Sequence, residues 1–184
     1  MIFVLEEKLE PATKKQFDLL EDQILKDKET QEMLMPPMKD IPQYRWIFRS
    51  ELQLDIIKNI NLFEGIKALN SISKIKVLFS KAGSKFTGFL AYQEKGSEIT
   101  SIKMASFKKA DAKSLNPVLI KDLVNFLNQE ISRKTKITWI VYEDNNSAIN
   151  QYDRHLDTGK FIWFKDKYNE DGINKYLYTI TGKK

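Results

Sequence analysis

The sequence contains no cysteine and a single histidine, His155. Without cysteine, the chain can form neither a disulfide nor a thiolate metal site, and it has no cysteine nucleophile. With one histidine it cannot build a metal site from several imidazoles. Zinc sites of the common cysteine and histidine types and cysteine-dependent hydrolases are therefore excluded.

Long hydrophobic runs are also missing. No stretch of about 18 apolar residues occurs, so the sequence predicts no membrane-spanning helix and no membrane partner. The first seven residues lack a basic lead, and their apolar run is too short for a signal peptide. We therefore expect a cytoplasmic protein.

Basic residues are in only mild excess, with 30 of them against 25 acidic residues and a net charge of +5. A weak positive field favours an anionic small ligand such as a nucleotide. Because the basic residues are spread along the chain rather than gathered in a stripe, we expect no nucleic-acid partner. A chain of 184 residues with 42% hydrophobic content predicts a single domain over residues 1–184.

The first third of the chain predicts one strand and two helices. Residues 2–6 read as a short strand, and a helix after Pro11 carries apolar residues at helical spacing. Residues 30–49, rich in proline and methionine, predict an irregular loop. Ser50 is the expected N-cap of a second helix that ends near Asn70.

The remainder alternates between strand and helix patterns. Three strands, at 75–80, 86–94 and 99–107, are separated by turns at Gly83 and Gly96 and predict an antiparallel meander. The later elements are a long amphipathic helix from Pro117 to about Arg133, a buried strand at 137–142, a helix at 146–156, and two strands at 161–164 and 175–180. The order is β-α-α-β-β-β-α-β-α-β-β, which predicts an α/β (α+β) fold with a mixed central sheet flanked by helices.

The most informative residues follow the buried strand. Asn145, Ala148 and Tyr152 stand at spacings 0, +3 and +7, which brings all three near one face of a helix. This strand–Asn–helix–Tyr arrangement resembles the end of the acyl-CoA-dependent N-acetyltransferases of the GNAT superfamily, and the order of elements resembles that whole fold. The resemblance implies a protein that transfers an acyl group from acetyl-CoA to a small-molecule or peptide amine.

The same resemblance assigns roles to particular residues. Tyr152 would be the catalytic acid that protonates the departing thiolate, and Asn145 would contact the pantetheine chain. Pantetheine would also pair with the backbone of the strand at 102–107, through Met104 and Ser106. The pyrophosphate would lie at the N-terminus of the following helix, whose unpaired amides attract anions, near Lys113, Ser114 and Asn116.

Several of these residues have alternative interpretations. The glycines that the GNAT family has before the long helix are absent from residues 111–118, and Asp111 would repel a pyrophosphate. Tyr152 can simply pack between helix and sheet, while Asn145 and Asn116 can act only as helix caps. A catalytically inactive GNAT-fold binding module is therefore the alternative function.

Other questions stay open at the level of sequence. The carboxylates Glu94, Glu98 and Glu143 lie near strand ends, but none is identifiable as the general base. The apolar residues of the loop at 30–49 can line an acceptor pocket or close over the core; they are Met33, Met35, Met38, Tyr44 and Trp46. The sequence names neither the acceptor nor the acyl chain, and it leaves a homodimer open.

Overall fold

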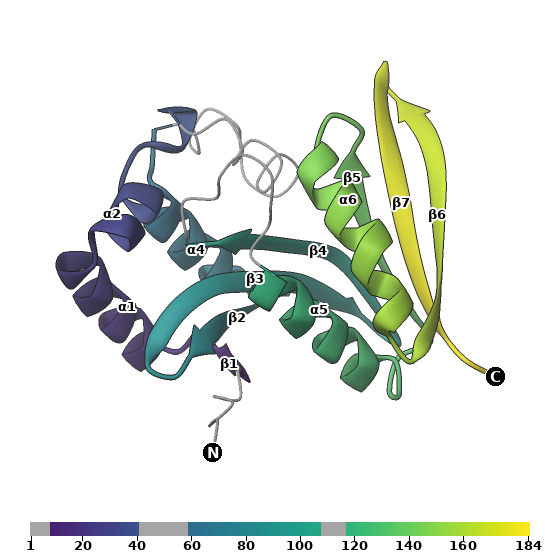
Figure 1. Ribbon diagram of the computed structural model, residues 1–184, viewed down its shortest axis with the longest axis horizontal. Coiled ribbons are helices and arrows are strands. Elements are labelled where there is room, and N and C mark those ends of the chain that lie inside the picture. Colours follow the sequence, from purple (N-terminus) through teal and green to yellow (C-terminus); the bar gives the residue numbers. More distant parts are fainter. Residues whose placement is uncertain (1–7, 41–58, 108–116) are drawn as a thin grey trace.

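The structure is a computed structural model that describes residues 8–40, 59–107 and 117–184 (Figure 1). A seven-stranded sheet has the order β1-β2-β3-β4-β5-β7-β6. Its strands are β1 (Lys8–Pro11), β2 (Ile75–Ala82), β3 (Lys85–Lys95), β4 (Glu98–Ser106), β5 (Lys136–Tyr142), β6 (Phe161–Glu170) and β7 (Ile173–Gly182). Neighbouring strands are antiparallel except β4 and β5, which are parallel.

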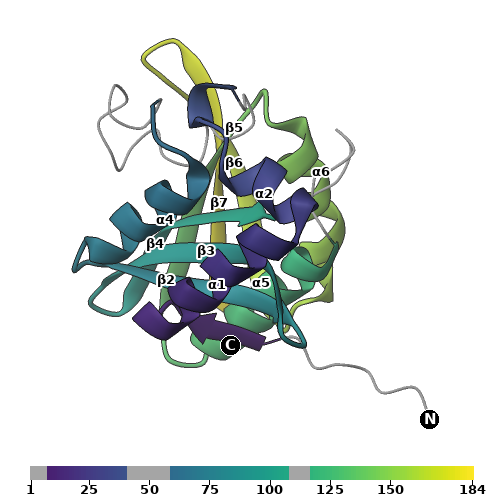
Figure 2. The same cartoon turned by 90° about the vertical axis from the view of Figure 1, so that its left-hand side faces the viewer.

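The described helices cover both faces of the sheet (Figure 2). On one face lie α1 (Lys14–Lys26), α2 (Lys28–Leu34) and α4 (Leu62–Ser71), and on the other lie α5 (Pro117–Glu130) and α6 (Asn146–His155). Short 3₁₀ turns follow α2 (Met38–Asp40) and α6 (Leu156–Thr158). The predicted mixed α/β fold is confirmed. The order differs in one respect, because three described α-helices, not two, precede β2.

Alternation along the strands explains the two layers, because successive side chains of a strand point to opposite faces. On the first face, α1, α2 and α4 share a hydrophobic cluster with β2 and β3, in which the rings of Phe17 and Phe79 lie 5.1 Å apart. On the second face, α5 and α6 share a cluster with β4, β5 and β7 that includes Leu123, Ile99 and Trp139.

Helix α5 lies very close to the sheet. A Cβ atom on Gly88 of β3 would come within 2.6 Å of the Ala105 carbonyl oxygen and 3.2 Å of the Leu119 side chain. Only glycine leaves room for that approach. The buried carboxylate of Asp122 in α5 accepts a hydrogen bond from the Ser80 hydroxyl of β2, which fixes the helix further.

The helix predicted from Ser50 to near Asn70 is confirmed from Leu62 onward but is wrong at residues 59–61. Asn59 and Ile60 lie in a turn, and α4 begins at Leu62. Asn61 caps it in a reciprocal capping box: its side chain accepts from the Glu64 amide at 2.8 Å, and the Glu64 carboxylate accepts from the Asn61 amide. A capping box marks the first turn of a helix, so α4 begins here. The helical spacing of apolar residues in the sequence runs through this point and therefore did not reveal it. Ser50 and the strand predicted at 2–6 lie outside the described residues.

The loop predicted at 30–49 begins later than expected, because α2 continues to Leu34. Asp27 caps α2, accepting from the Glu29 amide at 3.2 Å. Met33 and Met38 are buried in the first cluster, which supports the core interpretation for these two, whereas Met35 is exposed. Tyr44 and Trp46 lie outside the described residues.

Candidate functional site

Strands β4 and β5 separate soon after they meet. Their parallel pairing consists of Glu98 with Lys136 and Ile99 with Ile137. Beyond these residues β4 runs on to Ser106, while β5 stays paired with β7 on its other side as far as Tyr142. The two strands head in different directions (Figure 1), so their backbones separate toward their carboxyl ends; we call this separation of the two backbones the gap.

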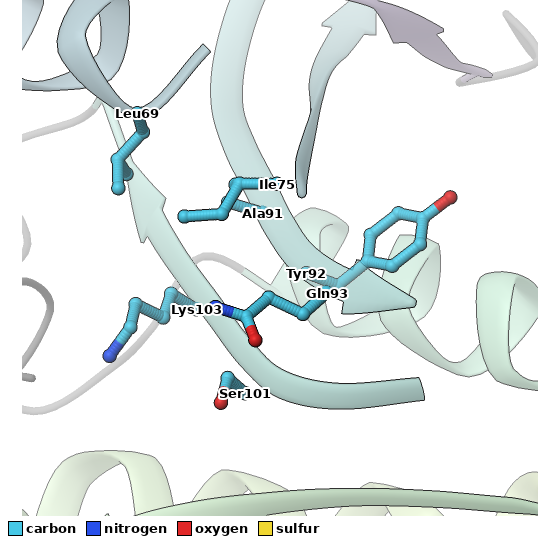
Figure 3. Close-up of a pocket in the computed structure, with 7 residues that line it drawn as sticks. All are labelled: Leu69, Ile75, Ala91, Tyr92, Gln93, Ser101 and Lys103. Carbon is cyan, nitrogen blue, oxygen red and sulfur yellow. The ribbon is translucent and has the colours of Figure 1, made fainter. Parts of the chain in front are cut away.

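A β-bulge in β4 gives a local cause for this separation. Across β3 and β4, Ala91 opposes Lys103 but Gln93 opposes Thr100, so one extra residue of β4 lies between these pairs. Ser101 there has a positive φ of 56°. Bulges bend a strand and increase its twist, which turns the end of β4 away from β5. Figure 3 shows Ser101 beside Gln93 and Lys103 at a shallow pocket.

The backbone of β4 presents alternate groups to the gap. The Phe107 amide donates to the Thr87 carbonyl of β3 at 2.9 Å. In an antiparallel pair, residues that bond to the partner strand alternate with residues whose N–H and C=O point the other way. Ala105 therefore faces β3, while the backbone groups of Met104 and Ser106 face the β5 side, as their predicted role requires.

The predicted helix face after β5 is present. Ala148 and Tyr152 are both buried in the second cluster. Asn145 is the N-cap of α6, with its Oδ1 accepting from the Ala148 amide at 3.4 Å. The capping interpretation of Asn145 is thus confirmed, whereas a contact with a ligand is not tested.

Tyr152 lies in an aromatic group over β5 and β7. Its ring meets Trp139 edge-on at 5.5 Å and Tyr178 at 5.3 Å. Burial raises the pKa of the Tyr152 hydroxyl far above its usual value, because the phenolate would be poorly solvated there. The hydroxyl therefore holds its proton more tightly than a free phenol does, which makes it a weaker proton donor.

The three candidate carboxylates are engaged in ion pairs. Glu94 lies 3.0 Å from Lys76, Glu98 lies 3.3 Å from Lys136, and Glu143 contacts Lys167. Hydrogen bonds from these lysines lower the pKa values of Glu94 and Glu143. Since a general base works best with a pKa near the working pH, neither residue is suited to that role.

Gln151 and Trp139 carry polar atoms that no feature of the sequence singles out. Both are buried, and Gln151 Oε1 and Trp139 Nε1 have no hydrogen-bond partner among the described residues. No pattern in the sequence marks a buried polar atom as unpaired. The predicted pyrophosphate residues Lys113, Ser114 and Asn116 lie outside the described residues.

Among the described residues, the structure shows neither a metal-binding cluster nor a membrane-spanning helix. Within residues 8–40, 59–107 and 117–184, no group of three or more histidine, aspartate or glutamate side chains is arranged to hold a metal ion. In the same ranges, no helix has the length and apolar character needed to cross a membrane.

Comparison with known proteins gives matches of structure alone. No family model matches the chain, and no curated protein does. An acetyltransferase from Thermus thermophilus is 15% identical, with a TM-score of 0.54 and coverage of 97% of this chain and 98% of that one. The N-acetyltransferase PseH of Campylobacter jejuni, solved with acetyl coenzyme A, is 11% identical, with a TM-score of 0.51 and coverage of 97% and 100%.

A third match comes from Salmonella typhimurium, an acetyl transferase that modifies the N-terminal serine of ribosomal protein L7/L12. It is 11% identical, with a TM-score of 0.52 and coverage of 96% of this chain and 95% of that one. These likenesses extend over nearly the whole of each chain. The protein therefore has the fold of the GNAT acetyltransferases, as the sequence resemblance predicted.

Proposed function

We propose that this protein is an N-acyltransferase that moves an acyl group from acetyl-CoA to an amine. The observation that carries the proposal is the separation of β4 from β5 beyond Ile99 and Ile137. It leaves a strand edge with hydrogen-bonding groups directed into a gap, where an extended amide-bearing chain can pair as a further strand would. The Met104 backbone is the central group of that edge.

The cofactor would lie along this gap, with its thioester near α6 and its phosphates near the start of α5. Lys113, Ser114 and Asn116 come just before α5 in the sequence, and we assign them to the pyrophosphate. Asn145 would face the pantetheine while it caps α6. The bound thioester supplies an activated acyl group.

In the transfer step, the amine nitrogen forms a bond to the thioester carbonyl carbon, and the bond from that carbon to sulfur breaks. Tyr152 gives its proton to the departing sulfur and recovers one from the amine by way of solvent. Burial raises the pKa of the Tyr152 hydroxyl and makes it a weaker acid, so the proposed role rests on the position of Tyr152 on α6 and not on its pKa. Backbone amides near the gap would polarise the carbonyl.

The acceptor class is an amine, by analogy with the protein N-terminus modified by the Salmonella typhimurium enzyme. The net charge of +5 suits an anionic cofactor more than a polycationic acceptor. We therefore favour a small-molecule or peptide amine without several positive charges.

One observation favours a second function, that of an inactive binding module with the same fold. Residues 111–118 contain no glycine, so side chains occupy the stretch that would cradle a pyrophosphate. Fold alone does not fix activity. In that case the gap would bind a peptide or a different nucleotide without turnover.

A thermal shift with acetyl-CoA separates the two functions. Ligand at a hundredfold excess over its dissociation constant should stabilise the protein by about 2.7 kcal/mol. A panel of amines, assayed for free thiol release, then tests turnover. Absence of binding at millimolar acetyl-CoA would contradict the acyltransferase proposal.

The anionic end of the ligand can be tested separately. Binding should weaken with added salt and on Lys113→Glu, because both reduce attraction to the phosphates. Lys95→Glu is the matched control. Lys95 is the last residue of β3 and pairs with Glu98, so it lies at the start of β4, far along the strand from Ser106. Equal affinity in the two variants would place the phosphates elsewhere.

A further inference from the structure

Tyr178 of β7 is completely buried, and its hydroxyl bonds to helix α6. The hydroxyl donates a hydrogen bond to Asp153 Oδ1 at 2.8 Å, and Asp153 Oδ2 accepts from Lys165 of β6. Burial, followed by the hydrogen bond to Asp153, raises the pKa of Tyr178, so the hydroxyl remains a donor. Strands β6 and β7 therefore hold one side chain of α6 by two directional contacts.

The ring of Tyr178 is part of a stack that spans three strands. It lies nearly parallel to the Trp139 ring of β5, with centroids 5.3 Å apart and an angle of 7° between the planes. It also lies 6.1 Å from the Trp163 ring of β6, at 18°. The Trp163 indole in turn donates to Asp157 at 2.8 Å. Because Asp157 follows Asp153 by four residues, both carboxylates hold the same side of α6 and its following turn against β6 and β7.

Tyr152 precedes Asp153 in α6, and successive residues of a helix are about 100° apart around its axis. The ring of Tyr152 meets the stacked pair edge-on, 5.5 Å from Trp139 at 72° and 5.3 Å from Tyr178 at 66°. A rotation of α6 that moved this ring would also carry Asp153 away from the Tyr178 hydroxyl. The hydrogen bond between Asp153 and Tyr178 therefore restricts the place of the Tyr152 ring.

We propose that Asp153 and Tyr178 are positioning residues that hold Tyr152 in place for the transfer step. The inference rests on the proposed function, in which Tyr152 gives its proton to the departing sulfur. Proton transfer needs a donor within hydrogen-bond reach, and a misplacement of about 1 Å can cost a hundredfold in rate. Asp153 and Tyr178 thus act on the rate through Tyr152.

Tyr178→Phe tests the inference, because it keeps the stacked ring and removes only the hydroxyl. We expect kcat for acyl transfer to fall about tenfold to a hundredfold, while the affinity for acetyl-CoA stays within about twofold of the wild type. The melting temperature should fall by about 2–4 °C through the lost hydrogen bond. Tyr176→Phe is the matched control: Tyr176 lies two residues earlier in β7, on the same face, and the change should leave kcat unaltered.

A double variant separates positioning from a merely structural effect. In the Tyr152→Phe background no hydroxyl remains to be positioned, so adding Tyr178→Phe should change the remaining kcat by less than about twofold. A structural role would lower kcat by the same factor in both backgrounds. That result would overturn the inference.

Asp153 allows a rescue experiment. Asp153→Asn keeps an oxygen that can accept from the Tyr178 hydroxyl, so kcat should stay within about threefold of the wild type. Asp153→Leu removes the acceptor and should lower kcat as much as Tyr178→Phe does. Equal kcat values for the two Asp153 variants would contradict the inference.

Failure of the proposed function gives a different set of results. No binding of acetyl-CoA by the wild type would remove the function, and full activity of Tyr152→Phe would remove the acid; either result overturns this inference as well. A slow Tyr152→Phe variant beside a fully active Tyr178→Phe variant would overturn the inference alone and leave the acyltransferase proposal standing.

Discussion

Ile99 of β4 and Ile137 of β5 form the last paired position between their strands, and both side chains are completely buried. One residue pair before them, Glu98 and Lys136, completes the shared ladder. Beyond this point lies the part of β4, with the Met104 backbone at its centre, that we propose pairs with an extended ligand.

Gly88→Ala should destabilise the protein by about 1–3 kcal/mol, since the new methyl group would press against the Ala105 carbonyl and Leu119. Strand β4 and helix α5 would each have to move away from β3. Urea denaturation measures the loss. Gly182→Ala is the matched control, because the nearest atom there, on Ile131, lies 4.0 Å from the new carbon. Equal stability of the two variants would show that α5 does not sit tightly on β3.

Leu123→Ala should cost about 2–5 kcal/mol through lost transfer energy and an unfilled cavity. Leu123 is completely buried between α5 and the sheet. The exposed neighbour Asn125 supplies a control, and Asn125→Ala should stay within about 0.5 kcal/mol of the wild type. A loss below about 0.5 kcal/mol for Leu123→Ala would mean that this face of α5 is misassigned.

Tyr92 should make the fold sensitive to alkaline pH. Burial, followed by the charges of Glu130 and Glu94, raises the pKa of Tyr92 from 10.0 to about 12. Between these values the folded protein keeps the proton and the unfolded chain releases it, so the stability contribution present below pH 10 is lost as the pH rises toward 12. The loss should be on the order of 2 kcal/mol.

Tyr92→Phe keeps the ring that packs 4.9 Å from Phe126 and removes the titrating hydroxyl. Denaturation of wild type and variant at several pH values between about 9 and 12 isolates the effect of Tyr92 from that of other groups. The two stability curves should diverge as the pH rises. Parallel curves would be incompatible with the raised pKa.

Tyr152→Phe tests the proposed acid. Once an acceptor is found, the rate constant of acyl transfer should drop by about 10²–10⁴ while the affinity for acetyl-CoA stays nearly constant. The ring contacts with Trp139 and Tyr178 remain, so stability should change by about 1 kcal/mol or less. Tyr176→Phe on β7 is the control and should be fully active. Full activity of Tyr152→Phe would remove the assigned role.

Much of the fold could be read from the sequence because its turns are chemically explicit. Gly83, Gly96 and Gly172 all adopt the positive φ that tight turns require, and they separate the strands as predicted. Asn145 caps α6, and Ala148 and Tyr152 share its buried face. Turns and helix caps of this kind depend on neighbouring residues, so they can be predicted without knowing which distant parts of the chain are in contact.

The break before α4 was missed because the apolar spacing of a helix continued through Ile60, and only the capping box formed by Asn61 and Glu64 marks the new start. The bulge at Ser101 did leave a signal. In the sequence, that signal is the spacing of three between the apolar residues Ile99 and Ile102. A regular strand would place them on opposite faces, whereas in the structure both belong to the second cluster. The orphaned atoms of Gln151 and Trp139 left none, because a missing partner is a property of the packed structure.

Hydrogen exchange of the β4 amides, with and without acetyl-CoA, shows whether the ligand pairs with the backbone of β4. If the ligand pairs with the strand edge in the gap, the Met104 amide should exchange at least about tenfold more slowly when acetyl-CoA is bound, because its opening would then require ligand release. The Ala105 amide, directed at β3, should change much less. Binding of acetyl-CoA with no change in exchange at Met104 would contradict the account.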